Sequence, residues 1–156
     1  MKSRFALGAI AMSAMFVLCR PSVAAVSSVG APADEFALAT EIRVTLDDTF
    51  QMKFSEKPVV KAGNIINFVV TNRGRIRHEF FIGDKAEQLK HKRKIRALRG
   101  TAENAQTSFS NAILLAPGQT KSLKWRFDNP GKVVIFACNM PGHYEAGEYY
   151  ITVVEE

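Results

Sequence analysis

Hydrophobic and polar residues alternate in short runs over most of the chain from residue 41 onward. Ile42, Val44 and Leu46 are separated by polar neighbours, and the same period of two returns over residues 50–54. This period is typical of a strand that buries one face. Clusters of Gly, Pro, Asn and Asp stand between the runs, as they do in turns. The pattern therefore predicts a succession of short strands joined by turns.

Further runs rich in Ile, Val and Phe follow these two. We expect strands at residues 64–71, 75–82, 112–115, 121–127, 132–138 and 147–154. Residues 112–127 are interpreted as a hairpin, because the turn sequence APGQ at 116–119 joins its two runs. With about seven or eight short strands, the chain is expected to form an all-β, antiparallel sandwich.

Residues 84–99 interrupt the alternation. Asp84 followed by Glu87 has the form of a capping box, and Gly100 stands where a helix is expected to end. Its apolar residues form only a narrow stripe, made of Leu89, Ile95 and Leu98. We expect a short, basic helical insertion that lies over the sandwich. A single helix that does not alternate with strands disfavours a parallel α/β sheet.

The first residues have the pattern of a secretory signal peptide. Lys2 and Arg4 precede an apolar run over residues 5–18, and the small residues 23–25 resemble a cleavage site. The apolar run is too short to span a bilayer as a helix. We therefore expect residues 1–25 to be removed on export, which places the mature protein in the periplasm of a Gram-negative bacterium and leaves no membrane association.

Composition divides the remainder into a flexible N-terminal arm, residues 26–40, and one domain, residues 41–156. Loss of residues 1–25 removes three basic residues and no acidic one, which lowers the formal net charge from +6 to +3. Residues 85–99 carry seven basic side chains against Glu87 alone, so the basicity is local. No aromatic residues interleave with these charges, so nucleic acid is not an expected partner.

The apolar run 133–135 leads into a short segment with metal-binding chemistry, FACNMPGH at 136–143. Cys138 and His143 share this loop, and His78 lies on the apolar face of the strand expected at 75–82. One thiolate and two imidazoles are the equatorial ligands of a blue-copper-type site. Cys138 is also the one cysteine left after signal removal, and an unpaired cysteine in an exported protein is reactive, intermolecular or a ligand. The nearby histidine favours the ligand.

Two segments carry a family resemblance, HEFFIG at 78–83 and CNMPGHYEAG at 138–147. They resemble the cupredoxins, and in particular the exported bacterial copper-tolerance cupredoxins, over roughly residues 41–154. The resemblance implies a Greek-key β-sandwich and one copper ion that cycles between Cu(I) and Cu(II). It also implies a role in copper tolerance by sequestration, or in electron transfer, with a redox or copper-transfer protein as partner.

One position departs from the family pattern. The family usually places an axial methionine five residues after the second histidine, and Glu148 occupies that position here. A carboxylate is a harder donor than a thioether, so it is expected to favour Cu(II) and to lower the reduction potential. The hypothesis is that Glu148 is an axial or near-axial ligand. The alternatives are that it points to solvent, that a backbone carbonyl approaches the copper, or that Met140 supplies the axial donor.

Several other residues receive a structural interpretation. His91 stands among basic residues and is expected to be a solvated helix residue, and Met52 is expected in the core. Arg73, Arg75 and Arg77 form a solvated strand face in this interpretation, with a docking patch for an acidic redox partner as the alternative.

Three other classes of function stay open on the sequence alone. Copper reductases and oxidases of this fold need further histidine clusters, and the chain has only three histidines, so we expect no enzyme unless a partner chain completes a copper oxidoreductase. One cysteine and two histidines also suit zinc with an open position. A metal-free interaction module that keeps the fold is the remaining alternative.

Overall fold

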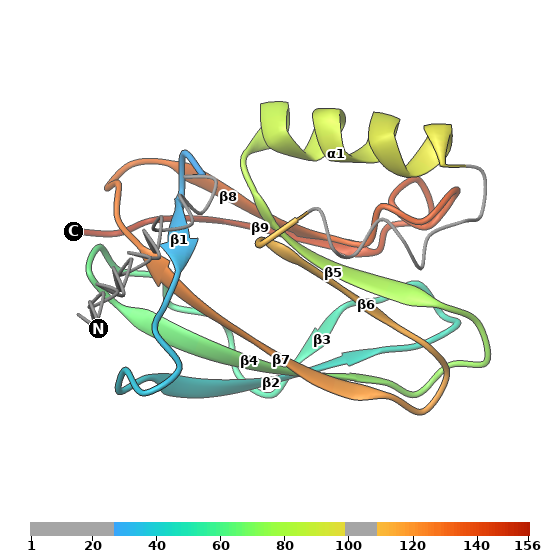
Figure 1. The fold of residues 1–156 in the computed structure, drawn as a ribbon, viewed down its shortest axis with the longest axis horizontal. Coiled ribbons are helices and arrows are strands. Elements are labelled where there is room, and N and C mark those ends of the chain that lie inside the picture. Colours follow the sequence, from blue (N-terminus) through green and yellow to red (C-terminus); the bar gives the residue numbers. More distant parts are fainter. Residues whose placement is uncertain (1–26, 99–108) are drawn as a thin grey trace, which may run out of the picture.

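The computed structural model describes residues 27–98 and 109–156, which form two β-sheets packed face to face (Figure 1). The first sheet has five strands in the order β1-β7-β4-β2-β3, and the second has four in the order β6-β5-β8-β9. The expected all-β sandwich is confirmed. Within the described residues no helix is long and apolar enough to cross a membrane. The signal peptide predicted at 1–25 lies outside the described residues.

Within the described residues, the elements include one helix, which stands between the fifth and sixth strands. Their bounds are β1 Gly30–Pro32, β2 Thr40–Leu46, β3 Lys53–Phe54, β4 Ile65–Asn72, β5 His78–Gly83, α1 Lys85–Ala97, β6 Ala112–Leu115, β7 Thr120–Phe127, β8 Val133–Ala137 and β9 Tyr149–Val153.

Two strand pairings differ from the sequence prediction. Strands β2 and β4 are parallel, because β3 pairs with the other edge of β2 and the chain then returns to start β4 in the direction of β2. The hairpin expected over 112–127 is wrong: β6 pairs with β5 in one sheet, and β7 pairs with β4 in the other. The turn at residues 116–119 therefore carries the chain between the sheets, which a local turn pattern cannot distinguish from a hairpin.

Aromatic side chains from both sheets fill the space between them. The rings of Phe68 and Phe80 lie 5.2 Å apart, and Phe136 stacks on Phe80 at 5.7 Å. Trp125 and Phe127 of β7 complete this layer and are fully buried. Each such side chain contributes about 1.5–3 kcal/mol by leaving water. The core therefore fixes how β5 and β8 lie relative to each other, and both strands lead into the candidate metal site.

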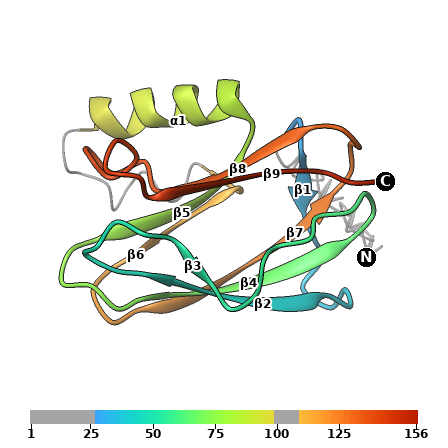
Figure 2. The same cartoon turned by 180° about the vertical axis from the view of Figure 1, so that it is seen from behind.

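Helix α1 covers the outer side of the four-stranded sheet, where it contacts β5 and β8 (Figures 1 and 2). For this reason β5 is buried at every position instead of alternating. The strand also begins at His78 and not at residue 75, so Arg73, Arg75 and Arg77 belong to the connection from β4 and not to a strand face. Outside the sheet, Phe81, Ile135 and Ala137 form a second apolar cluster with Phe109 and Tyr144 packed against it.

The helix itself confirms one prediction and corrects another. Asp84 and Glu87 form a reciprocal capping box, which starts the helix at Lys85. The residues buried beneath it are Gln88, His91 and Ile95, whereas Leu89 is 42% exposed. The expected stripe of Leu89, Ile95 and Leu98 is therefore wrong in part. The face that turns inward is largely polar, because polar groups lie below it.

The segment expected as a flexible arm, 26–40, makes more contacts than its composition indicates. Strand β1 pairs with β7, and Val29 is fully buried. Gly30 makes this close pairing possible, since a Cβ atom there would lie 1.9 Å from the carbonyl oxygen of Arg126. The hydroxyl group of Ser28 also donates to Asp84 at the start of α1. The division into signal, arm and domain stays a prediction.

The connection that presents His78 is held by Asn72, the last residue of β4. Its buried side-chain amide donates to the carbonyl oxygens of Ile76 and Leu115, and its oxygen accepts from the Gly74 N–H group. These three bonds shape the five residues between β4 and β5. The position of His78 therefore depends on the side chain of Asn72, which lies at the end of β4 in the other sheet.

We expect Asn72→Ala to lower the free energy of unfolding by about 1–3 kcal/mol, because it leaves buried backbone groups without partners. Urea unfolding followed by tryptophan fluorescence measures this change. Asn129→Ala is the matched control, since its amide makes one exposed bond to the backbone of Ser28. That variant should lie within about 0.5 kcal/mol of wild type. Equal stabilities for the two variants would contradict this account of the connection.

Candidate metal centre

The four predicted ligands lie at one end of the four-stranded sheet. His78 is the first residue of β5, Cys138 directly follows β8, and Glu148 directly precedes β9. The ladder between β8 and β9 ends at the pair Ala137 and Tyr149, and the Cys138 N–H group then donates to the carbonyl oxygen of Glu148 at 3.0 Å. Cys138 and Glu148 are therefore neighbours because their strands pair.

The loop between β8 and β9 folds back to bring His143 to the same point. The His143 N–H group donates to the Met140 carbonyl oxygen at 3.1 Å, and the Glu148 N–H group donates to the His143 carbonyl oxygen at 3.0 Å. Gly142 and Gly147 have φ angles of 90° and 107°, which favour glycine over residues with a Cβ atom. The Pro141-Gly142 sequence thus allows the tight return that the spacing predicts.

The side chains of all four residues converge. One ligand atom from each of His78, Cys138, His143 and Glu148 lies within 4.8 Å of the others. Cys138 Sγ is 3.3 Å from His143 Nδ1, and the Glu148 carboxylate lies 2.7 Å from His78 Nδ1 and 3.0 Å from His143 Nδ1. All four residues are buried. This is the arrangement that the sequence motifs predict, though the role of each residue as a ligand stays a prediction.

Glu148 is the residue on which the sequence left most alternatives open. Its side chain is fully buried and its carboxylate bridges the Nδ1 atoms of the two histidine rings, so the alternative in which it points to solvent is wrong. A carboxylate in this position is costly without partners. The two imidazoles supply them, and the oxygen atoms face the same point as the sulfur atom.

Burial and mutual contacts shift the pKa values of Glu148, His78 and Cys138. Burial opposes ionisation of Glu148, but hydrogen bonds from His143 and His78 outweigh it and lower the pKa of the carboxyl group. Burial also opposes the charged form of His78, yet Glu148 and Asp48 raise the pKa of its ring. Burial and the Glu148 charge raise the pKa of Cys138 well above its usual range. These interactions favour the carboxylate form of Glu148, the protonated ring of His78 and the neutral thiol of Cys138.

Two backbone N–H groups point at the Cys138 sulfur atom. The Glu79 N–H group donates to Sγ at 3.3 Å, and the Met140 N–H group also donates to it. Both bonds favour the thiolate, which is the form that binds a metal. Met140, the alternative axial donor, is half-buried and contributes its backbone to the site.

Sequence reasoning missed two residues that contact the histidine rings. Asp48 Oδ1 lies 3.5 Å from His78 Nε2, on the side of the ring away from Glu148. The Arg75 N–H group donates to both oxygens of Asp48, which fixes the carboxylate and lowers its pKa. Phe50 packs its ring 4.8 Å from that of His143. Its φ of 57° is uncommon for a residue with a side chain, and such backbone strain often marks a functional site.

The prediction that His91 is solvated is wrong. The ring is 2% exposed, stacks on Phe81 at 4.9 Å, and has its Nε2 atom 2.7 Å from Glu79 Oε1. Glu79 also accepts from the backbone and side-chain N–H groups of Asn139. The signal in the sequence was helical spacing, since Gln88, His91 and Ile95 recur at intervals of three and four. The basic residues next to His91 in the sequence suggested an exposed position instead.

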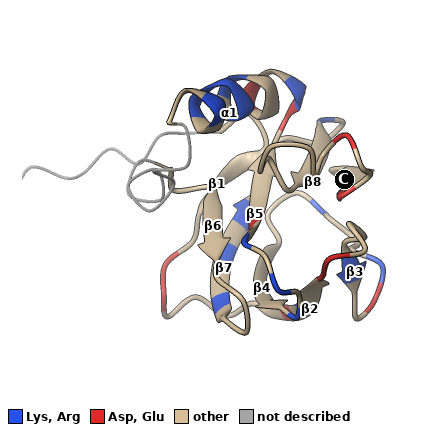
Figure 3. Cartoon of the chain, turned by 90° about the vertical axis from the view of Figure 1, so that its right-hand side faces the viewer, with Lys and Arg blue, Asp and Glu red and all other residues tan. Residues whose placement is uncertain are grey.

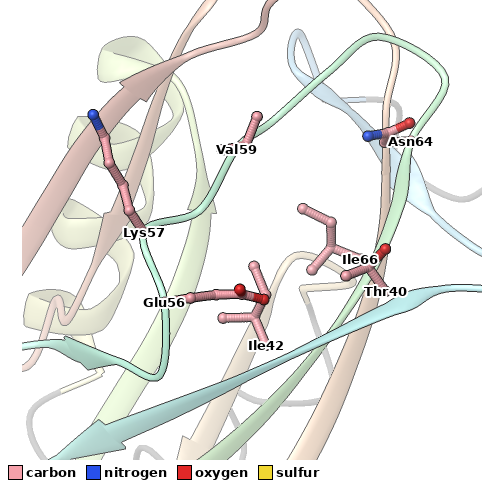
Figure 4. Close-up of a pocket in the computed structure, with 7 residues that line it drawn as sticks. All are labelled: Thr40, Ile42, Glu56, Lys57, Val59, Asn64 and Ile66. Carbon is pink, nitrogen blue, oxygen red and sulfur yellow. The ribbon is translucent and has the colours of Figure 1, made fainter.

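A shallow pocket lies elsewhere on the molecule and shares no residue with the cluster (Figure 4). It has a volume of about 140 Å³ and lies beside β2 and the start of β4. Its lining residues are Thr40, Ile42, Glu56, Lys57, Val59, Asn64 and Ile66.

The donor set is chemically suited to a metal ion. It combines one sulfur atom, two imidazole nitrogens and one carboxylate oxygen, and thiolate with imidazole is the combination that suits copper or zinc. Each donor is buried and positioned by a strand end or by the loop between strands. The residues present therefore fit a single metal ion held by four side chains.

Solved structures of auracyanins have a similar fold. Auracyanin from Roseiflexus castenholzii matches 77% of this chain and 100% of its own with a TM-score of 0.57 and 21% sequence identity. Auracyanin A from Chloroflexus aurantiacus, described as a "blue" copper protein, matches 76% of this chain and 100% of its own with a TM-score of 0.58 and 21% identity. At these identities the likeness shows the fold alone, which is that of the cupredoxins.

Relatives found by sequence are more similar to this chain in amino-acid identity than these solved structures are. No family model matches the chain. A protein of Vibrio cholerae named copper-resistant cuproprotein CopI is 38% identical over 121 residues, which cover 78% of this chain and 69% of the relative. A protein of the same name from Rubrivivax gelatinosus is 34% identical over 119 residues, covering 76% of this chain and 68% of the relative. Identity at this level over most of both proteins shows that the chain belongs to the family of copper-resistant cuproproteins named CopI.

Proposed function

We propose that this chain is a periplasmic protein of copper tolerance that holds one copper ion through His78, Cys138, His143 and Glu148. The observation that carries the proposal is the convergence of four buried donor atoms within 4.8 Å. The names of the CopI relatives support copper resistance as the setting. The signal-like sequence at residues 1–25 supports export to the periplasm. When bound, copper would supply a centre that can change between Cu(I) and Cu(II).

Copper sequestration is favoured over rapid electron transfer by the fourth donor. A buried carboxylate stabilises Cu(II) more than a thioether does, which lowers the reduction potential and holds the oxidised ion. Electron transfer is the second candidate. It is supported by the strands that hold the donors in place, because a rigid site changes little between oxidation states. In either case the partner would be a redox or copper-transfer protein.

The proposal is for a binding protein and not an enzyme. The chain has three histidines, and two of them are in the cluster. The third, His91, is buried beneath α1, hydrogen-bonds to Glu79 through Nε2 and lies outside the cluster. A copper oxidoreductase would need further ligands from another chain.

Titration of the protein lacking residues 1–25 with Cu(II) should give a thiolate-to-copper absorption band that saturates at one equivalent. Cys138→Ser should abolish the band, because sulfur is its source, while leaving the fold intact by circular dichroism. Zn(II) should compete for the site without any visible band. A protein that binds zinc but never develops the copper band would contradict the proposal and favour a zinc site.

Glu148→Gln tests the fourth donor, since the amide keeps the shape and removes the charge. We expect the Cu(II) affinity to fall about 10-fold or more, the reduction potential to rise, and the EPR spectrum to change. Glu35→Gln, at an exposed position of the N-terminal segment, is the control for loss of one charge. A variant with the spectrum and potential of wild type would show that Glu148 is not a ligand.

Copper affinity should rise with pH between 6 and 8. The raised pKa of Cys138 means that its thiol keeps a proton over this range, and the metal must displace it. One displaced proton makes the affinity rise about tenfold per pH unit, and the raised pKa of His78 adds to this slope at the acidic end. Competition with a chelator of known pH dependence measures the slope. An affinity independent of pH would exclude the protonated thiol.

A further inference from the structure

We propose that α1 positions the copper-binding loop, residues 138–148, through polar side chains on one side of the helix, some of them buried beneath it and some at the surface. The inference rests on the proposed function, because it assigns the helix a role in holding Cys138 and His143. In Figure 1 the loop between β8 and β9 lies beneath the C-terminal half of α1. Contacts from three successive helical turns join the two segments, one set buried and one at the surface.

The buried contacts join α1 to the residue after Cys138. Gln88 Nε2 donates to Asn139 Oδ1 at 2.8 Å, and His91 Nε2 donates to Glu79 Oε1 at 2.7 Å. Glu79 in turn accepts from the Asn139 backbone N–H group at 3.3 Å and from its side-chain amide at 3.2 Å. All four residues are buried, so each bond lost would leave a polar group without a partner.

Glu79 connects this buried set directly to the donors. Its backbone N–H group donates to Cys138 Sγ, and it follows His78 in the chain. Its side chain meanwhile holds Asn139, which follows Cys138. A displacement of the Glu79 carboxylate would therefore move residues next to two of the proposed ligands. His91, on the helix, binds the other oxygen of this carboxylate, Oε1, and so helps to orient it.

The surface contacts join α1 to the far part of the loop. Lys92 Nζ lies 2.7 Å from Glu145 Oε1, and Arg96 Nη2 lies 2.9 Å from the same oxygen. Lys92 Nζ also stands over the Tyr144 ring, 5.1 Å from its centre. Tyr144 and Glu145 directly follow His143. The surface set therefore acts on the part of the loop that presents the second histidine.

Helical spacing explains how one element makes all of these contacts. Gln88, Lys92 and Arg96 follow one another at intervals of four, and His91 lies three residues after Gln88, so the four residues occupy one broad side of α1. Figure 3 colours the basic residues along α1 blue. Lys90 is an exposed basic residue of the helix that is outside this set. The basic composition of the helix thus includes two groups that pair with the loop and others that face solvent.

Two substitutions of His91 separate a hydrogen-bonding role from a packing role. His91→Phe keeps the ring between Phe81 and Phe109 but loses the donor, whereas His91→Gln keeps a donor and loses the ring. We expect His91→Phe to lower the Cu(II) affinity about 10-fold and to shift the EPR hyperfine splitting and the thiolate-to-copper band. His91→Gln should restore most of both spectra. A larger change in affinity and spectra for His91→Gln than for His91→Phe would assign His91 to packing and overturn the proposal.

Glu145→Gln tests the surface contacts without disturbing the core. We expect a chelator to remove Cu(II) about twofold to fivefold faster than from wild type, the range expected for exposed ion pairs. Lys92→Gln should act in the same direction, and Lys90→Gln is its matched control with an unchanged rate. In protein without copper, amide hydrogens of residues 139–147 should exchange faster in Glu145→Gln and Lys92→Gln than in Lys90→Gln.

Failure of the proposed function and failure of the positioning role of α1 give different experimental results. If wild type shows no thiolate-to-copper band, the proposed function fails, and the exchange measurement still tests whether α1 holds the loop. If wild type shows the band, and His91→Phe, Glu145→Gln and Lys92→Gln all match Lys90→Gln in spectrum, removal rate and exchange, the positioning role of α1 is excluded.

Discussion

A carboxylate buried between two imidazole rings is the constraint on which the rest of the site depends. Glu148 has no access to solvent, and its carboxylate lies within 3.0 Å of the Nδ1 atoms of His78 and His143. Buried ionised groups are destabilising unless they are paired. The same oxygen and nitrogen atoms that compensate each other in the protein are those that would bind copper, so the proton and the metal ion compete for one set of donors.

The sandwich serves this site by bringing three strand ends to one place. β5 begins at His78, β8 ends before Cys138, and β9 begins after Glu148, with the aromatic core holding the sheets together. Of the four residues, His143 is the one that lies inside the loop and away from a strand end. That loop is the segment α1 contacts through Asn139 and Glu145, so the helical insertion lies where the strands alone provide least support. The proposed copper site and the proposed role of α1 therefore both concern the loop between β8 and β9.

Local patterns in the sequence predicted much of this and failed for identifiable reasons. Alternation located most strands, the Asp84 and Glu87 pair located the start of α1, and the cysteine and histidine spacing located the cluster. The predictions that failed concern tertiary contacts, which local patterns do not determine. Whether β6 and β7 form a hairpin depends on which sheet each joins, and the burial of His91 depends on Glu79 lying beneath the helix. Asp48 approaches His78 from a turn thirty residues away, which no local spacing reveals.

X-ray absorption at the copper edge of the loaded protein tests the central claim most directly, because it reports the atoms around the metal. The account predicts one sulfur neighbour together with nitrogen and oxygen neighbours from two imidazoles and a carboxylate. A copper environment without sulfur, or one built from water and carboxylates alone, would contradict it.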